Sequence, residues 1–130
     1  MVIDLEKVEL KSTDKTYLKD DGEYVVTITN VEEGVSSNKG TPYLKFECKT
    51  DDDRYCTTSL YLTESAMWRF KKFIMALGHP GTGTIDPITL SRTCIGKRCI
   101  VVCAHPEKIN PITNEKEISK YLEVIDYIKC

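Results

Sequence analysis

The chain has 130 residues, of which 41% are hydrophobic and 29% charged, and its formal net charge is −2. This composition indicates one globular domain with an ordinary core, and it excludes a disordered chain. No apolar run reaches the roughly 20 residues of a membrane helix, and the first residues do not form a signal peptide. We therefore expect a cytoplasmic protein that has no membrane partner and that binds nucleic acid only through a localised basic surface.

The N-terminal 21 residues show no clean periodicity, so we predict an N-terminal arm (1–21) followed by one domain (22–130). A short strand is expected in the arm at Val2–Leu5. The first strand of the domain is predicted at Gly22–Glu33, where β-branched residues dominate and alternate. A bulge in this strand would return Val31 to the core.

Two more strands are predicted after a Gly- and Ser-containing loop at 34–40, namely 41–50 and 54–62. Each alternates cleanly between two faces. The expected core faces carry Leu44, Phe46 and Cys48 in one strand and Cys56, Thr58, Leu60 and Leu62 in the other. Asp51, Asp52 and Asp53 form a solvated turn between the two strands.

A helix is predicted from Thr63 to Leu77, with Thr63 as its N-cap and Gly78 at its end. Its apolar stripe comprises Ala66, Met67, Phe70, Phe73, Ile74 and Leu77. A long connection (79–92), a fourth strand (97–104), a polar hairpin loop (106–119) and a fifth strand (120–128) complete the chain. This order predicts an all-β fold, a five-stranded OB-fold barrel with one α-helix between strands three and four.

The six cysteines lack the spacing of a zinc or redox motif, and most lie within strand patterns. We expect buried reduced thiols, and metal ligation and disulfides stay open as alternatives. The two histidines precede prolines in loops, and the chain has no phosphate-binding loop or nucleophile elbow. The sequence therefore predicts a protein that is not an enzyme, with no catalytic residue, metal site or cofactor.

The candidate site lies on the outer faces of the second and third strands. Tyr43, Lys45, Tyr55 and Tyr61 project there, and Lys39 and Lys116 lie in loops that could extend the surface. Aromatic rings stack on bases, and lysines neutralise phosphates. Tyrosines also suit any exposed sheet face, and Glu47 on the same face would repel phosphate, so the alternative of an ordinary solvated face stays open.

Trp68 lies almost opposite the apolar stripe of the helix, near Lys72 and Met75. These three residues form a candidate interaction surface. We expect Trp68 to be covered by the arm or by the connection at 79–92. A subunit contact in a homo-oligomer and stacking on nucleic acid stay open.

Four segments carry a family resemblance: Gly40-Thr-Pro-Tyr-Leu-Lys-Phe-Glu, Ser59-Leu-Tyr-Leu-Thr, Ala66-Met-Trp-Arg-Phe-Lys-Lys-Phe-Ile-Met-Ala-Leu-Gly and Ile95-Gly-Lys-Arg-Cys-Ile-Val. Together they resemble phage-type single-stranded DNA-binding proteins, over roughly residues 22–127. The resemblance implies an OB-fold, sequence-independent binding of single-stranded DNA in phage replication and recombination, and a place in the host cytoplasm. The alternative is an OB-type adaptor that contacts recombinase or replication proteins.

Overall fold

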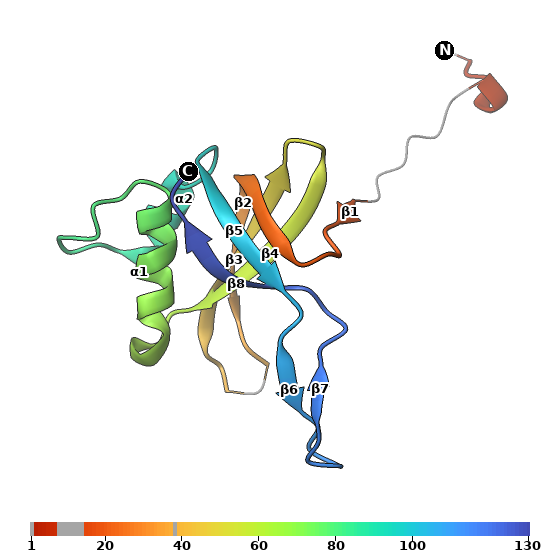
Figure 1. Cartoon of the computed structure of the whole chain (residues 1–130). Helices are drawn as coiled ribbons and strands as arrows, with labels where there is room; N and C mark the ends of the chain where they lie inside the picture. Colours follow the sequence, from red (N-terminus) through yellow and green to blue (C-terminus); the bar gives the residue numbers. More distant parts are fainter. Residues whose placement is uncertain (1, 8–14, 38) are drawn as a thin grey trace.

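The computed structural model describes residues 2–7, 15–37 and 39–130, and it is built mainly from strands. Six strands form one curled sheet in the order β1-β4-β3-β2-β5-β8, and two more form a separate hairpin, β6–β7 (Figure 1). The strands are β1 (Thr16–Tyr17), β2 (Gly22–Val35), β3 (Pro42–Thr50), β4 (Arg54–Tyr61), β5 (Arg98–Ala104), β6 (Glu107–Ile109), β7 (Lys116–Ile118) and β8 (Glu123–Ile128). The helices are the 3₁₀ turns η1 (Leu5–Lys7) and η2 (Glu64–Ala66), and α1 (Met67–Ala76) and α2 (Pro87–Thr93).

The long strand β2 joins the two halves of the sheet. It pairs antiparallel with β5 and with β3, and its register against β3 shifts between Ile28 and Asn30. This irregularity is the predicted bulge, and Val31 beyond it packs against the core. The shift lets one strand curve and still keep its apolar residues on the inner face.

The core lies between the inner face of the sheet and helix α1. Leu44, Phe46 and Cys48 of β3 are completely buried, which confirms the predicted alternation of that strand. Phe73 of α1 packs between Phe46 and Tyr127, with ring centroids 4.6 and 4.9 Å away. The apolar stripe of the helix therefore packs mainly against the sheet.

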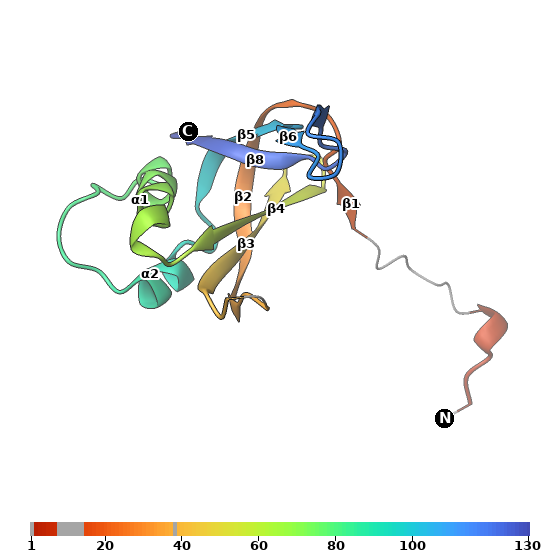
Figure 2. The same ribbon diagram turned by 90° about the horizontal axis from the view of Figure 1, so that it is seen from below.

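The sheet is curled but does not close into the predicted five-stranded barrel. The short strand β1 pairs in parallel with β4 at Arg54 and Tyr55, so β4 already has a neighbour at this end. Within the described part of the chain β4 and β8 form no backbone ladder. The Thr58 and Tyr127 hydroxyls bond across this opening, and α1 lies against both strands (Figure 2).

The helix and the predicted loops differ from the expected elements in several places. Thr63 caps η2, whose 3₁₀ turn precedes α1, so the α-helix begins at Met67. The connection at 79–92 contains most of α2, which Asp86 caps through the backbone N–H of Ile88. The loop at 106–119 contains the strands β6 and β7, and β8 begins at Glu123. The strand predicted at Val2–Leu5 is absent from these described residues, where only η1 begins.

Five of the six cysteines are buried free thiols, as expected, and Cys130 is exposed. Burial raises the pKa of the Cys99 thiol to about 12, which keeps it protonated near neutral pH. No cluster of metal-ligating side chains occurs among the residues that the structure describes. None of the helices in that part of the chain is long and apolar enough to cross a membrane.

Candidate nucleic-acid interface

An open groove of about 790 Å³ lies on the outer face of β3 and β4, next to the loop between β2 and β3. Four of the six predicted site residues line it: Lys39, Tyr43, Lys45 and Tyr61. The full lining is Val35, Ser36, Ser37, Lys39, Thr41, Tyr43, Lys45, Thr57, Ser59 and Tyr61. The groove therefore combines aromatic rings, hydroxyl groups and two ammonium groups on one surface.

The two groove tyrosines are held by the sheet itself. Tyr43 and Tyr61 are direct cross-strand partners, and their rings meet edge to face with centroids 5.9 Å apart. The Tyr43 ring lies over Gly34 of β2, where an added Cβ would approach the ring to 2.4 Å. The absence of a side chain at Gly34 thus leaves room for the ring of Tyr43.

Lys39 and Lys45 form no ion pair with any described residue, so their charges stay available to a ligand. Both are exposed. Glu32 stands opposite Lys45 in the β2–β3 register, and it is the nearest acidic position along the ladder. The two lysines give the groove a local positive charge, which suits an anionic ligand, on a chain whose net charge is negative.

Glu47, which the sequence placed on the same face, has its charge compensated. Lys15 donates to its carboxylate at 2.6 Å, and Thr29 Oγ1 donates to the other carboxylate oxygen at 2.9 Å. The bond from Lys15 holds the pKa of Glu47 below its usual value and raises the pKa of Lys15. The repulsion of phosphate expected from Glu47 is therefore reduced by a residue in the predicted arm.

The other two predicted site residues lie outside the groove. Tyr55 is half-buried, with the Tyr17 ring centroid 6.5 Å away and the Lys15 ammonium 5.0 Å from its own ring centroid. Lys116 lies on β7, in the hairpin that extends from the sheet in the same direction as the β2–β3 loop (Figure 1). The structure thus brings four of the six residues together in the groove, and it places Tyr55 elsewhere on β4 and Lys116 on the separate β6–β7 hairpin.

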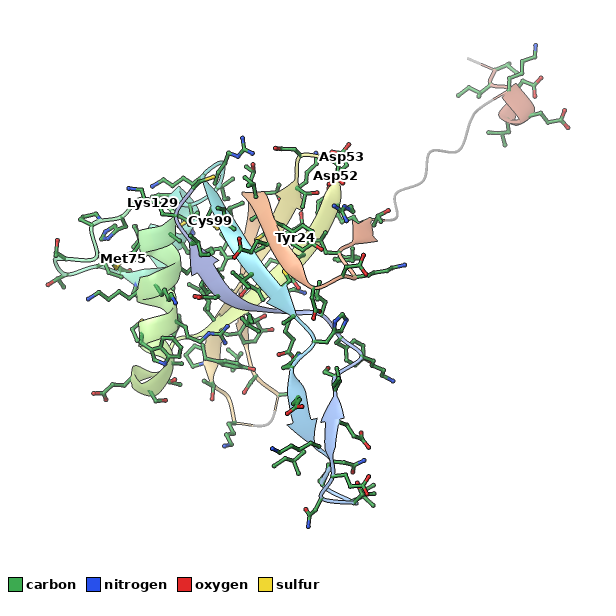
Figure 3. The ribbon with its side chains drawn as sticks, viewed as in Figure 1. Tyr24, Asp52, Asp53, Met75, Cys99 and Lys129 are labelled. Carbon is green, nitrogen blue, oxygen red and sulfur yellow. The ribbon has the colours of Figure 1, made fainter. Side chains whose placement is uncertain are left out.

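Trp68 is 64% exposed, so the part of the chain that the structure describes does not cover it as expected, and residues 8–14 of the predicted arm lie outside that part. Met75 does meet the connection after α1, because an added Cβ at Gly81 would lie 2.7 Å from its Sδ. Lys72 pairs with Asp126 of β8. Figure 3 shows Met75 on the side of α1 that faces this connection.

The turn between β3 and β4 is solvated, as predicted, and its three carboxylates also form ion pairs. Asp51 binds Arg98 at 2.9 Å, Asp52 binds Arg54 at 2.8 Å, and Asp53 binds Lys49 at 2.8 Å. Asp52 and Asp53 stand at the tip of the turn in Figure 3. The three carboxylates have separate basic partners and do not converge on one point.

Sequence reasoning missed the hydroxyl groups of the groove. Thr57 and Ser59 lie between Tyr55 and Tyr61 on the same outer face of β4, so the period-two pattern of that strand carried the signal. It also missed Tyr17 and Tyr121, which lie near Tyr55 around a second, smaller pocket. Neither belongs to the strands from which the site was predicted.

A family model described as "Protein of unknown function (DUF669)" matches residues 6–127 of the chain. The match includes every residue of the groove and ends within β8. No curated protein matches the chain.

Proposed function

We propose that this chain, which belongs to the DUF669 family, binds single-stranded DNA independently of sequence during phage replication or recombination. The observation that carries the proposal is the groove on β3 and β4. Its Tyr43 and Tyr61 rings lie beside Lys39 and Lys45, two lysines without an ion-pair partner among the described residues.

The strand order supports an OB-type fold that remains open between β4 and β8. Five strands follow the order β4-β3-β2-β5-β8, α1 comes between β4 and β5, and the β6–β7 hairpin comes between β5 and β8. In OB-folds the face of the second and third strands, with the adjacent loops, binds oligonucleotides. In this chain that face is the one formed by β3 and β4.

The chemistry of the groove suits binding without catalysis. A base of any identity presents a π-face, and stacking on an aromatic side chain contributes about 1–3 kcal/mol per base. Lys39 and Lys45 would each neutralise a phosphate and release counterions. Because Tyr43 is held over Gly34 and against Tyr61, its ring loses little freedom when a base stacks on it.

A fluorescence titration with oligo-dT at 50 and 200 mM salt tests the proposal. We expect binding at low salt that weakens steeply at high salt, with a slope of about −0.7 per phosphate neutralised. No binding at low salt would reject the proposed function. An equal affinity at both salt concentrations would reject the role of the lysines.

The exposed Trp68 supports a second candidate function, that of an adaptor for recombination or replication proteins. Trp68 is 64% and Met75 42% exposed on the outside of α1. Large exposed aromatic side chains are enriched where proteins meet. The adaptor hypothesis predicts that the wild-type chain fails to bind oligo-dT. Our proposal predicts binding that Trp68→Ala leaves unchanged.

A further inference from the structure

We infer that the pocket formed by Tyr17, Tyr55 and Tyr121 is a second base-stacking site for the same DNA strand. The inference rests on the proposed function and extends it, because it sets the path and the minimum length of the bound strand. Of the site residues predicted from the sequence, Tyr55 alone lines this pocket.

The second pocket is small, about 210 Å³, and Tyr17, Tyr55 and Tyr121 are among the residues that line it. The full lining is Tyr17, Leu18, Tyr55, Cys56, Thr57, Cys103, Tyr121, Leu122, Glu123 and Val124. Tyr17 is 49% and Tyr121 69% exposed. The volume is below the range of about 300–1,000 Å³ typical of drug-sized ligands, and it suits a group of the size of one base.

Thr57 connects the two sites, because it lines both the groove and the second pocket. Tyr61 and Tyr55 are on the same outer face of β4, six residues apart, which corresponds to about 20 Å along a strand. At the axial rise of about 3.4 Å per nucleotide of one strand in B-form DNA, which is the fully stacked limit, this distance corresponds to about six nucleotides. A strand that reaches both sites falls within the range of about 4–16 nucleotides bound by one OB-fold.

The charges along this path favour a polyanion. Glu123 at the second pocket is paired with Lys108 at 2.7 Å, in the same way that Glu47 is paired with Lys15. The Lys120 ammonium lies 5.5 Å from the Tyr121 ring centroid and has no ion pair with the described residues. The carboxylates of Glu47 and Glu123 are therefore compensated, whereas Glu32, opposite Lys45, has no ion pair among the described residues. Lys120, which is also unpaired there, lies beside Tyr121 at the far end of the path.

The test measures the affinity of the full chain for dT4 and for dT16, with Tyr121→Ala and Tyr17→Ala as the variants. Each variant should bind dT16 about 5- to 150-fold more weakly than the wild type, because one stacked base is lost. The loss on dT4 should be smaller, because so short a strand can use the groove alone. Trp68→Ala, which removes an exposed aromatic residue from α1, is the matched control and should change neither affinity.

The possible results separate the two proposals. If the wild type binds neither oligonucleotide at low salt, the proposed function fails and the second site fails with it. If Tyr43→Ala weakens dT16 binding but Tyr121→Ala and Tyr17→Ala do not, the groove stands and the second site is overturned. An equal loss on dT4 and dT16 also overturns the second site. All three tyrosine variants are checked by thermal unfolding, and their exposed or half-exposed positions should leave the fold intact.

Discussion

Tyr43 lies over Gly34 so closely that a Cβ at position 34 would stand 2.4 Å from the Tyr43 Cζ. The two residues are cross-strand partners on β3 and β2. The backbone of one strand therefore supports an aromatic ring of the next. This contact makes the orientation of the Tyr43 ring testable without removing the ring.

Gly34→Ala should displace the Tyr43 ring and weaken oligo-dT binding about five-fold, the lower end of about 1–3 kcal/mol for one stacked base. The measurement is a fluorescence titration at low salt, with thermal unfolding as the check on folding. In the Tyr43→Ala background the same glycine substitution should have no further effect on binding. An equal loss in both backgrounds would show that Gly34 does not act through Tyr43.

Lys45→Ala and Lys39→Ala should each reduce the salt slope of oligo-dT binding by about 0.7, because each removes one phosphate contact. Lys71→Ala is the matched control, since Lys71 is exposed on α1, which packs on the other face of the sheet. The slope is measured from titrations at several salt concentrations. A similar change in the Lys71 variant would mean that the lysines act through net charge and not through the groove.

Lys15→Ala should weaken binding a few-fold although Lys15 does not line the groove. Its removal leaves the Glu47 carboxylate without its ionic partner beside the path of the strand. The double variant Lys15→Ala/Glu47→Gln should recover most of the lost affinity. If the double variant binds as weakly as Lys15→Ala alone, then Lys15 contributes through direct contact and not by compensating Glu47.

Phe73→Ala should lower the free energy of unfolding by about 3–5 kcal/mol, because it empties the centre of the core. Phe73 is completely buried and lies between the rings of Phe46 and Tyr127. Trp68→Ala on the same helix should change stability by less than about 0.5 kcal/mol, since surface substitutions rarely do more. Urea unfolding of both variants measures the difference, and equal losses would contradict the assignment of the helix faces.

The local pattern of the sequence was sufficient to predict which residues of β3 and β4 face the core and which face outward. Strict alternation placed Leu44 and Phe46 inside and Tyr43 and Lys45 outside, and the structure confirms each of these positions. The same period-two logic predicted the bulge before Val31. These features depend on neighbours along one strand or on the adjacent strand, which the sequence order already specifies.

The remaining features depend on contacts between distant segments. The short strand β1 pairs with the edge of β4. This pairing places Lys15 in an ion pair with Glu47 and the Tyr17 ring near the Tyr55 ring. Nothing in the periodicity of the first 21 residues indicates this pairing. The helix α2 is a different case, because Asp86 followed by Pro87 is a recognisable helix start that the loop prediction overlooked.

The most direct test of the groove as a DNA-binding surface compares the wild type with Tyr43→Ala/Tyr61→Ala by oligo-dT titration at 50 mM salt. We expect the wild type to bind and the double variant to bind at least about ten-fold more weakly, because the two tyrosine rings on which bases stack are removed. Trp68→Ala should bind like the wild type. A double variant that binds as tightly as the wild type would contradict the assignment of this face as the binding surface.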